Sequence, residues 1–152
     1  MIEKSDMILF TIGYEGKDIE EYVQVLEENM VKVVVDVRRN PISRKHGFSK
    51  TRMRETLASE GIDYLHLPRL GIESARRRSL KTRADYNALF LWYENEVLDK
   101  EKVSLGEIIE LISSDKRIAL TCFEADPTFC HRSKVSEKIS EIAAASLKLV
   151  HL

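Results

Sequence analysis

The segment Arg117–Ser133 reads RIALTCFEADPTFCHRS, and it decides the fold. Its apolar run, residues 118–120, predicts a short buried strand. Asp126-Pro127 then predicts a turn, because proline fixes its own φ and keeps the preceding residue out of the helical region. Apolar residues at helical spacing predict a helix over residues 133–145. The segment is therefore a strand, a polar loop and a helix, and in parallel sheets such loops bind ligands.

This loop carries more reactive side chains than a simple connection needs: Cys122, Glu124, Asp126, Cys130, His131 and Arg132. Cys122 has two interpretations, since a cysteine at a strand end can be a small buried hydrophobe or a reactive thiol. Cations at a helix start are unfavourable, because the amino end of a helix is itself positive. His131 and Arg132 at that position therefore indicate an anion nearby.

The rest of the chain alternates in the same way. Strands are predicted over residues 7–12, 31–37, 62–67, 117–121 and 147–152, with helices between them. This order predicts a single α/β domain over residues 1–152, with three layers: a mainly parallel sheet of about five strands and helices on both faces. The continuous apolar run VVV at residues 33–35 predicts an internal strand.

Right-handed crossovers place the carboxyl ends of parallel strands at one edge of the sheet. Asp36 with Arg38, His66 with Arg69, and Cys122 should meet there. A carboxylate at the end of a buried strand is seldom free, so Asp36 either pairs with an arginine or takes part in chemistry. The sequence leaves both possibilities open.

Charge is unevenly distributed. The whole chain has a net charge of −1, but residues 38–83 contain 13 Lys/Arg and 4 Asp/Glu, a balance of +9. This basic middle predicts an anionic partner, either a phosphorylated small molecule or a nucleic acid. The sequence does not indicate an oligomeric state.

Composition and the start of the chain bear on location. The 43% apolar and 32% charged residues are typical of a soluble globular protein, and no apolar run approaches a membrane span. Residues 1–10 lack the pattern of a signal peptide, so we expect a cytoplasmic protein without membrane contact. In a reducing compartment the two cysteines, Cys122 and Cys130, should be reduced and unbridged. Their spacing is not that of zinc ligands, and we predict no metal and no cofactor.

Four ordered motifs together resemble the domain of unknown function 488 family (DUF488). They are Thr11-Ile12-Gly13-Tyr14, Asp36-Val37-Arg38-x-x-Pro41-x-Ser43-Arg44, Tyr64-x-His66-Leu67-Pro68-x-Leu70-Gly71, and Cys122-x-Glu124-x-Asp126-Pro127-x-x-Cys130-His131-Arg132. The resemblance implies an α/β fold with a polar, arginine-rich site and no established reaction. Weaker similarity to rhodanese-type sulfurtransferases and Cys-dependent phosphatases rests on Asp-Val-Arg after an early strand and on Cys122.

We therefore interpret the chain as an anion-binding enzyme or binding protein for a phosphorylated or nucleic-acid substrate. The residues predicted to hold the anion are Arg38, Arg44, Arg69, Cys130 and Arg132, and the candidate catalytic residues are Asp36, Cys122, Glu124 and His131. One alternative is a sulfurtransferase or phosphatase in which Cys122 is the nucleophile. Another is a non-enzymatic nucleic-acid adaptor that uses only the basic middle.

Overall fold

The structure is a computed structural model that describes residues 7–143 and 147–152. The predictions made for residues 1–6 and for the end of the final helix at 144–145 lie outside these ranges. Within them, no helix is both long enough and apolar enough to cross a membrane.

The centre of the fold is a five-stranded sheet in which all strand pairs are parallel. The strands are β1 (Met7–Gly13), β2 (Val33–Asp36), β3 (Asp63–His66), β4 (Ile118–Cys122) and β5 (Leu147–His151). Their order across the sheet is β3-β2-β4-β1-β5. The predicted α/β sheet is confirmed, and β2 lies inside the sheet with all four residues buried, as its apolar sequence requires.

The helices follow the strands along the chain. The α-helices are α1 (Ile19–Glu28), α2 (Lys50–Ser59), α3 (Arg83–Tyr93), α4 (Lys102–Ser113) and α5 (Arg132–Ala143), and a π-helical segment, η3 (Glu94–Leu98), continues α3. Short 3-10 turns are η1 (Pro68–Leu70), η2 (Ser74–Arg76) and η4 (Pro127–Phe129). Helix α1 begins where the Asp18 carboxylate accepts a hydrogen bond from the Glu21 amide, and α3 begins with a capping box of Thr82 and Asp85.

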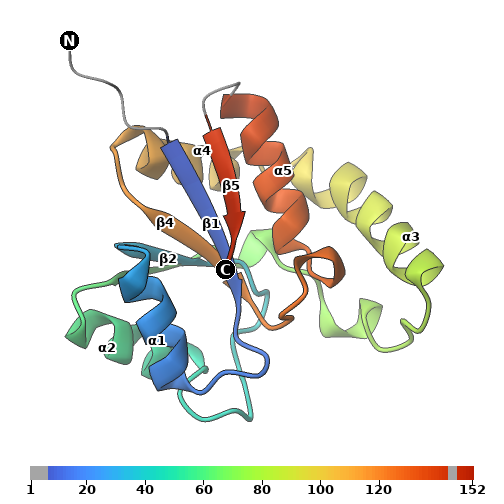
Figure 1. The fold of residues 1–152 in the computed structure, drawn as a ribbon. Helices are drawn as coiled ribbons and strands as arrows, with labels where there is room; N and C mark the ends of the chain where they lie inside the picture. The colour runs from blue at the N-terminus through green and yellow to red at the C-terminus, as the bar shows by residue number, and fades with distance from the viewer. Residues whose placement is uncertain (1–6, 144–146) are drawn as a thin grey trace.

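Two helical layers cover the sheet, as Figure 1 shows: α1 and α2 lie on one side, and α4 and α5 lie on the other. Alternation along each strand explains this arrangement, because neighbouring side chains point to opposite faces. In β1, Leu9 packs with the core under α4 and α5, while Phe10 packs with the core under α1 and α2. The expected three layers are therefore present.

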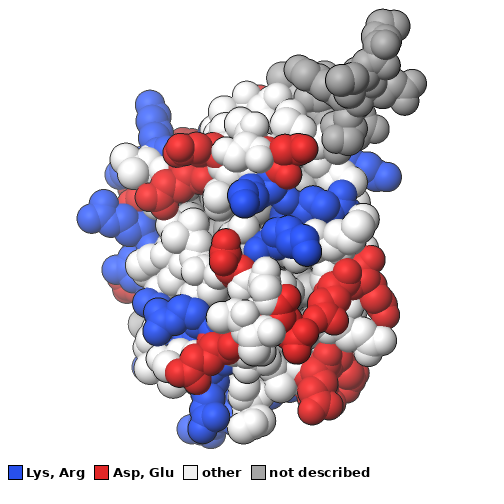
Figure 2. Space-filling model, turned by 90° about the vertical axis from the view of Figure 1, so that its left-hand side faces the viewer, with Lys and Arg blue, Asp and Glu red and all other residues white. Residues whose placement is uncertain are grey.

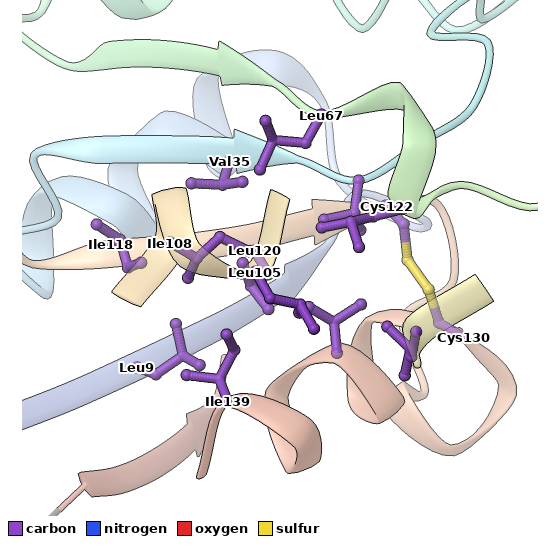
Figure 3. Close-up of a cluster of buried hydrophobic side chains, with 14 of the residues drawn as sticks. Leu9, Val35, Leu67, Leu105, Ile108, Ile118, Leu120, Cys122, Cys130 and Ile139 are labelled. Atoms are coloured by element: carbon purple, nitrogen blue, oxygen red, sulfur yellow. A yellow bond between two sulfur atoms is a disulfide. The ribbon is translucent and has the colours of Figure 1, made fainter. Parts of the chain in front are cut away.

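The core on the α4 and α5 side reaches the carboxyl edge of the sheet. Figure 3 shows Leu9, Leu120 and Ile139 at its centre, with Cys122 and Cys130 at the end where β4 finishes and α5 begins. Both cysteines are only 1% exposed. The loop between them is therefore anchored to the core at both of its ends.

Candidate functional site

The carboxyl ends of the strands meet side by side at one edge. Gly13 at the end of β1 is in register with Cys122 of β4, and Asp36 at the end of β2 is in register with Thr121 of β4 and His66 of β3. The motifs that are distant in sequence are therefore adjacent in space. This is the convergence that parallel topology predicted.

Asp36 and Arg38 form a buried ion pair. The Arg38 Nη2 atom lies 2.7 Å from Asp36 Oδ2, and both Nε and the backbone amide of Arg38 donate to Oδ1, at 2.9 and 3.1 Å. The Tyr64 hydroxyl donates to the same carboxylate. Burial alone would lower the pKa of Arg38, but the hydrogen bonds and charge of Asp36 raise it above its ordinary value. The pair neutralises itself inside the protein.

The remaining donors of Arg38 are also occupied. Its Nη1 atom donates to the Phe48 carbonyl at 2.8 Å and to the Tyr14 hydroxyl at 3.2 Å. Arg38 therefore ties the loop before α2 to the ends of β1 and β2. Of the alternatives left open by the sequence, the observed contacts correspond to structural pairing.

His131 is buried beside the same loop. Its Nε2–H donates to the Val37 carbonyl at 2.8 Å, which fixes the tautomer because a carbonyl can only accept. Burial lowers the pKa of His131 from 6.5 to about 4, so the imidazole is neutral at pH 7. A neutral ring in this position links the start of α5 to the end of β2.

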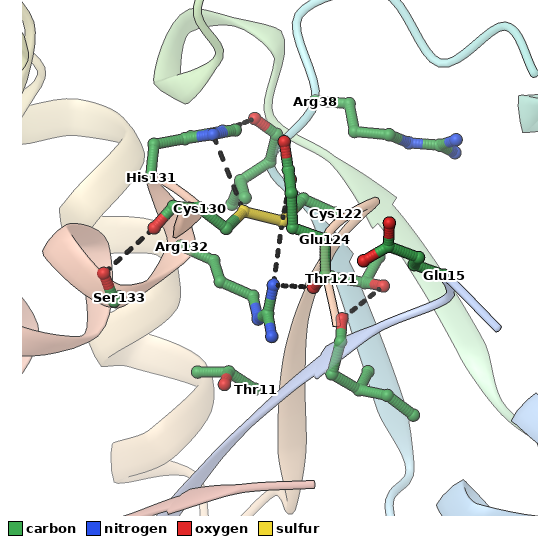
Figure 4. Close-up of a disulfide and its surroundings, with 12 residues drawn as sticks. Thr11, Glu15, Arg38, Thr121, Cys122, Glu124, Cys130, His131, Arg132 and Ser133 are labelled. Atoms are coloured by element: carbon green, nitrogen blue, oxygen red, sulfur yellow. Dashed lines mark hydrogen bonds between the residues drawn. A yellow bond between two sulfur atoms is a disulfide. The ribbon is translucent and has the colours of Figure 1, made fainter. Parts of the chain in front are cut away.

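Cys122 and Cys130 are joined by a disulfide. The expectation that both thiols are reduced and unbridged is therefore wrong for this structure. The fold brings the end of β4 and the start of α5 together, so cysteines eight positions apart in sequence become direct neighbours. Figure 4 shows the bridge between the Glu124 loop and His131, with the Arg132 guanidinium beneath it.

Arg132 is completely buried, with a relative exposure of 0%. Its Nη1 atom donates to the Glu124 carbonyl at 2.6 Å and lies 3.2 Å from Cys122 Sγ, and its Nη2 atom donates to the Ala125 carbonyl at 3.2 Å. Its Nε–H is buried and has no hydrogen-bond partner within the described ranges. Burial lowers the pKa of this guanidinium, as expected for a cation removed from water.

Glu124 is a partly exposed residue of the site. One carboxylate oxygen, Oε2, lies 3.5 Å from Cys122 Sγ, and the other, Oε1, lies 3.9 Å from Arg77 Nη1. Burial raises the pKa of Glu124, and the positive charges of Arg77 and Arg132 only partly offset this effect. Arg77 lies between β3 and α3, so this connection approaches the site over Glu124.

Four of the predicted site residues are buried among other groups of the protein. Asp36, Arg38, His131 and Arg132 all have buried side chains, and each contacts other groups of the protein. Arg44, in contrast, is exposed on the loop before α2. The catalytic and anion-binding roles assigned to these residues stay predictions.

Among the exposed arginines on the segments that follow β2 and β3, we call Arg39, Arg44 and Arg69 the basic rim. Within residues 7–143 and 147–152, none of them forms an ion pair. The loops that carry Arg39 and Arg69 are in contact, because a Cβ added to Gly71 would collide with the backbone of Arg39.

Comparison with known protein families identifies the family of this chain. The model of the domain of unknown function DUF488 matches residues 18–139, which is most of the sequence. The chain belongs to the DUF488 family. No curated protein and no solved structure matches it. The function of the DUF488 family is unknown, so the chemistry of this member has to be inferred from its own residues.

Three residues of this DUF488 chain lie close enough together to hold a metal ion. They are Cys122, Glu124 and Cys130, whose potential ligand atoms are all within 4.8 Å of one another. Thiolates bind metals, however, and both sulfurs are consumed in the disulfide. The adjacent Arg132 cation also opposes a second positive charge there. We therefore interpret this cluster as a thiol site and not as a metal centre.

Sequence reasoning missed two tyrosines and one arginine of the site. In the sequence, Tyr14 and Tyr64 appear only as members of the family motifs. In the structure the Tyr64 hydroxyl donates to Asp36, and the Tyr14 hydroxyl accepts a hydrogen bond from Arg38. Arg77 is one of several cations in a basic loop, and only its contact with Glu124 distinguishes it. The register of β3 beside β2 explains the contact of Tyr64 with Asp36. Val34 is the direct partner of Tyr64, and Asp36 lies two residues further along β2, on the same face as Val34.

Proposed function

We propose that the protein binds a phosphate-bearing ligand, a phosphorylated small molecule or a nucleic acid, on the basic rim. The observation that carries this proposal is the distribution of acids at the carboxyl edge. Asp36 is the only carboxylate in residues 31–54, and it is fully engaged by Arg38 and Tyr64. Arg39, Arg44 and Arg69 are left as exposed cations without a carboxylate partner among the described residues.

Arginine suits this role for a physical reason. Its planar guanidinium binds two phosphate oxygens at once, and each charge-assisted hydrogen bond contributes roughly 1.5–3 kcal/mol. Asp36 is already neutralised by Arg38, so its carboxylate does not compete with a ligand for the rim arginines. The rim can therefore bind an anion without rearrangement of the buried network.

The geometry favours this proposal over a Cys122 phosphatase or sulfurtransferase. Those enzymes surround their anion with backbone N–H groups, whereas the loop after Cys122 turns the Glu124 and Ala125 carbonyls toward Arg132. With its sulfur in a disulfide, Cys122 is also not a free nucleophile in this structure.

A broad nucleic-acid adaptor surface receives less support. Figure 2 shows one face of the molecule on which Lys and Arg side chains are interspersed with Asp and Glu. The face drawn there is therefore not uniformly basic. The rim is a smaller and more local site.

The test is binding of pyrophosphate and of a fluorescent single-stranded oligonucleotide, measured at low salt by calorimetry and anisotropy. Arg44→Gln and Arg69→Gln should each weaken binding about tenfold, as expected for losing one charge-assisted hydrogen bond. Lys116→Gln is the matched control, because this exposed cation precedes β4 at the opposite edge of the sheet.

Binding of the oligonucleotide with a steep dependence on salt would identify a nucleic acid as the ligand class. Binding of pyrophosphate alone would indicate a phosphorylated small molecule. If neither probe binds, or if Lys116→Gln weakens binding as much as the rim variants do, the proposal is refuted.

A further inference from the structure

Arg132 is a buried cation without a counter-charge. It is 0% exposed, and within the described parts of the chain no carboxylate lies within ion-pair distance of it. Its polar contacts are two backbone carbonyls and the sulfur of Cys122, and its Nε–H has no acceptor. Buried charges are normally paired, so this arrangement indicates a state in which an anion stands beside the guanidinium.

The group best placed to become that anion is the sulfur of Cys122. It lies 3.2 Å from Arg132 Nη1 and carries no charge while it is bonded to Cys130. Reduction would convert it to a thiol, and a neighbouring arginine favours the thiolate form of a cysteine. The missing negative charge would then appear at the observed contact.

We propose that Cys122 and Cys130 are a reversible thiol–disulfide pair, in which Arg132 holds the reduced Cys122 as a thiolate ready for exchange with dithiols and disulfides. This inference does not depend on the basic rim, since it concerns other residues and another ligand class.

The two cysteines are not equivalent. Beside Cys130, His131 Nδ1 lies 3.9 Å from Sγ, but the pKa of this histidine is about 4 and the ring supplies no positive charge at pH 7. Cys122 alone is in contact with a cation. Cys122 is therefore the thiolate, and Cys130 is the thiol that closes the disulfide.

Acidic groups near Cys122 oppose the effect of Arg132, because a negative charge disfavours the thiolate. Glu124 Oε2 lies 3.5 Å from the sulfur, and the pKa of Glu124 is raised by its burial. Glu15 reaches the same loop by accepting a hydrogen bond from the Ala125 amide. At the end of β2, the charges of Asp36 and Arg38 neutralise each other. Arg132 should therefore lower the pKa of the Cys122 thiol, and Glu124 should raise it.

Access to the sulfur depends on the Glu124 side chain. Its outer partner is Arg77, at 3.9 Å, and both side chains are partly exposed, so this ion pair is weak and can open. We expect a reductant to reach the disulfide when this ion pair opens, since Glu124 Oε2 lies 3.5 Å from the sulfur.

Reduction of the disulfide by a dithiol takes two electrons and two protons from the dithiol. A dithiol donates two electrons, the Cys122–Cys130 bond breaks, and a new disulfide forms in the dithiol. Of its two protons, one stays on Cys130 and the other is released to solvent, because Cys122 remains a thiolate. Oxidation by a small-molecule disulfide is the reverse reaction.

The test uses the full chain with Cys130→Ser, which isolates Cys122, and with Cys122→Ser, which isolates Cys130. The ultraviolet absorbance of the thiolate, followed against pH, needs no reagent to enter the site. The pKa of Cys122 should lie below the ordinary value of about 8.5, and that of Cys130 should not. In the Cys130→Ser background, Arg132→Gln should raise the pKa of Cys122 and reduce its thiolate fraction about tenfold at a pH between the two values.

Glu124→Gln should instead lower the pKa of Cys122, whereas Arg78→Gln, at an exposed arginine, should leave it unchanged. Opposite shifts from Arg132 and Glu124 are not expected from simple loss of structure, and Glu124→Gln keeps the test valid if Arg132→Gln does not fold. An ordinary pKa for Cys122, or shifts of the same sign in both variants, overturns the proposal.

Reversibility is measured on the unmodified protein by equilibration with reduced and oxidised dithiothreitol followed by mass spectrometry. We expect two interconverting species that differ by two hydrogens. Persistence of only one species across all dithiothreitol ratios also overturns the proposal.

Discussion

Asp36→Asn should destabilise the protein strongly, because it leaves the Arg38 cation buried without a counter-charge. Asp36 is 0% exposed and Arg38 is 8% exposed, so water cannot replace the lost partner. The asparagine amide would also place an N–H group against the donors of Arg38 or Tyr64.

The magnitude follows from this burial. Removing one partner of a buried pair costs about 3–5 kcal/mol. For a chain of this size, each kcal/mol lowers the melting temperature by about 2–4 °C, so we expect a decrease of about 6–20 °C. A purely catalytic Asp36 would predict loss of function with little change in stability.

The assay is thermal and urea unfolding followed by circular dichroism. Asp63→Asn is the matched control, since this aspartate is exposed on β3 and should change stability by less than about 0.5 kcal/mol. The double variant Asp36→Asn/Arg38→Met should be more stable than the sum of the single changes predicts, because removing both charges leaves no buried ion. If Asp36→Asn melts like Asp63→Asn, the ion pair does not have the structural role described above.

The remaining predictions concern His131 and two glycines. Because the folded-state pKa of His131 is about 4 and its ordinary value is 6.5, the unfolded chain binds more protons between these pH values, so stability should fall by about 3 kcal/mol as the pH decreases through this window. His131→Gln should flatten this dependence in urea titrations at several pH values, and an unchanged slope would contradict it. Gly71→Ala should destabilise by about 1–3 kcal/mol through collision with the Arg39 backbone, while Gly106→Ala, which meets nothing within 4 Å on α4, should stabilise by about 0.5–1 kcal/mol. Equal effects of the two substitutions in the same melts would show that the loop carrying Gly71 does not contact the Arg39 backbone.

The sequence by itself determined the class of fold. Short apolar runs such as VVV at residues 33–35 alternate with helical patterns, and these two periodicities fix strand and helix because each is a local property. Parallel topology then required the ends of β1, β2, β3 and β4 to share an edge. The set of residues near that edge, from Asp36 to Arg132, could therefore be predicted from the order of strands and helices alone.

Only the tertiary structure decided which of these residues face solvent and which face one another. Whether Asp36 is paired or free depends on the rotamer of Arg38 and on Tyr64 from the neighbouring strand, and neither is encoded by spacing. The same holds for Cys122 and Cys130, whose disulfide depends on how β4 and α5 pack. Arg132 shows the difference most clearly: a cation at a helix start predicted a nearby anion, and only packing places its side chain, buried, beside the sulfur of Cys122. Local patterns report backbone preferences, whereas contacts between side chains are fixed by the way distant segments pack together.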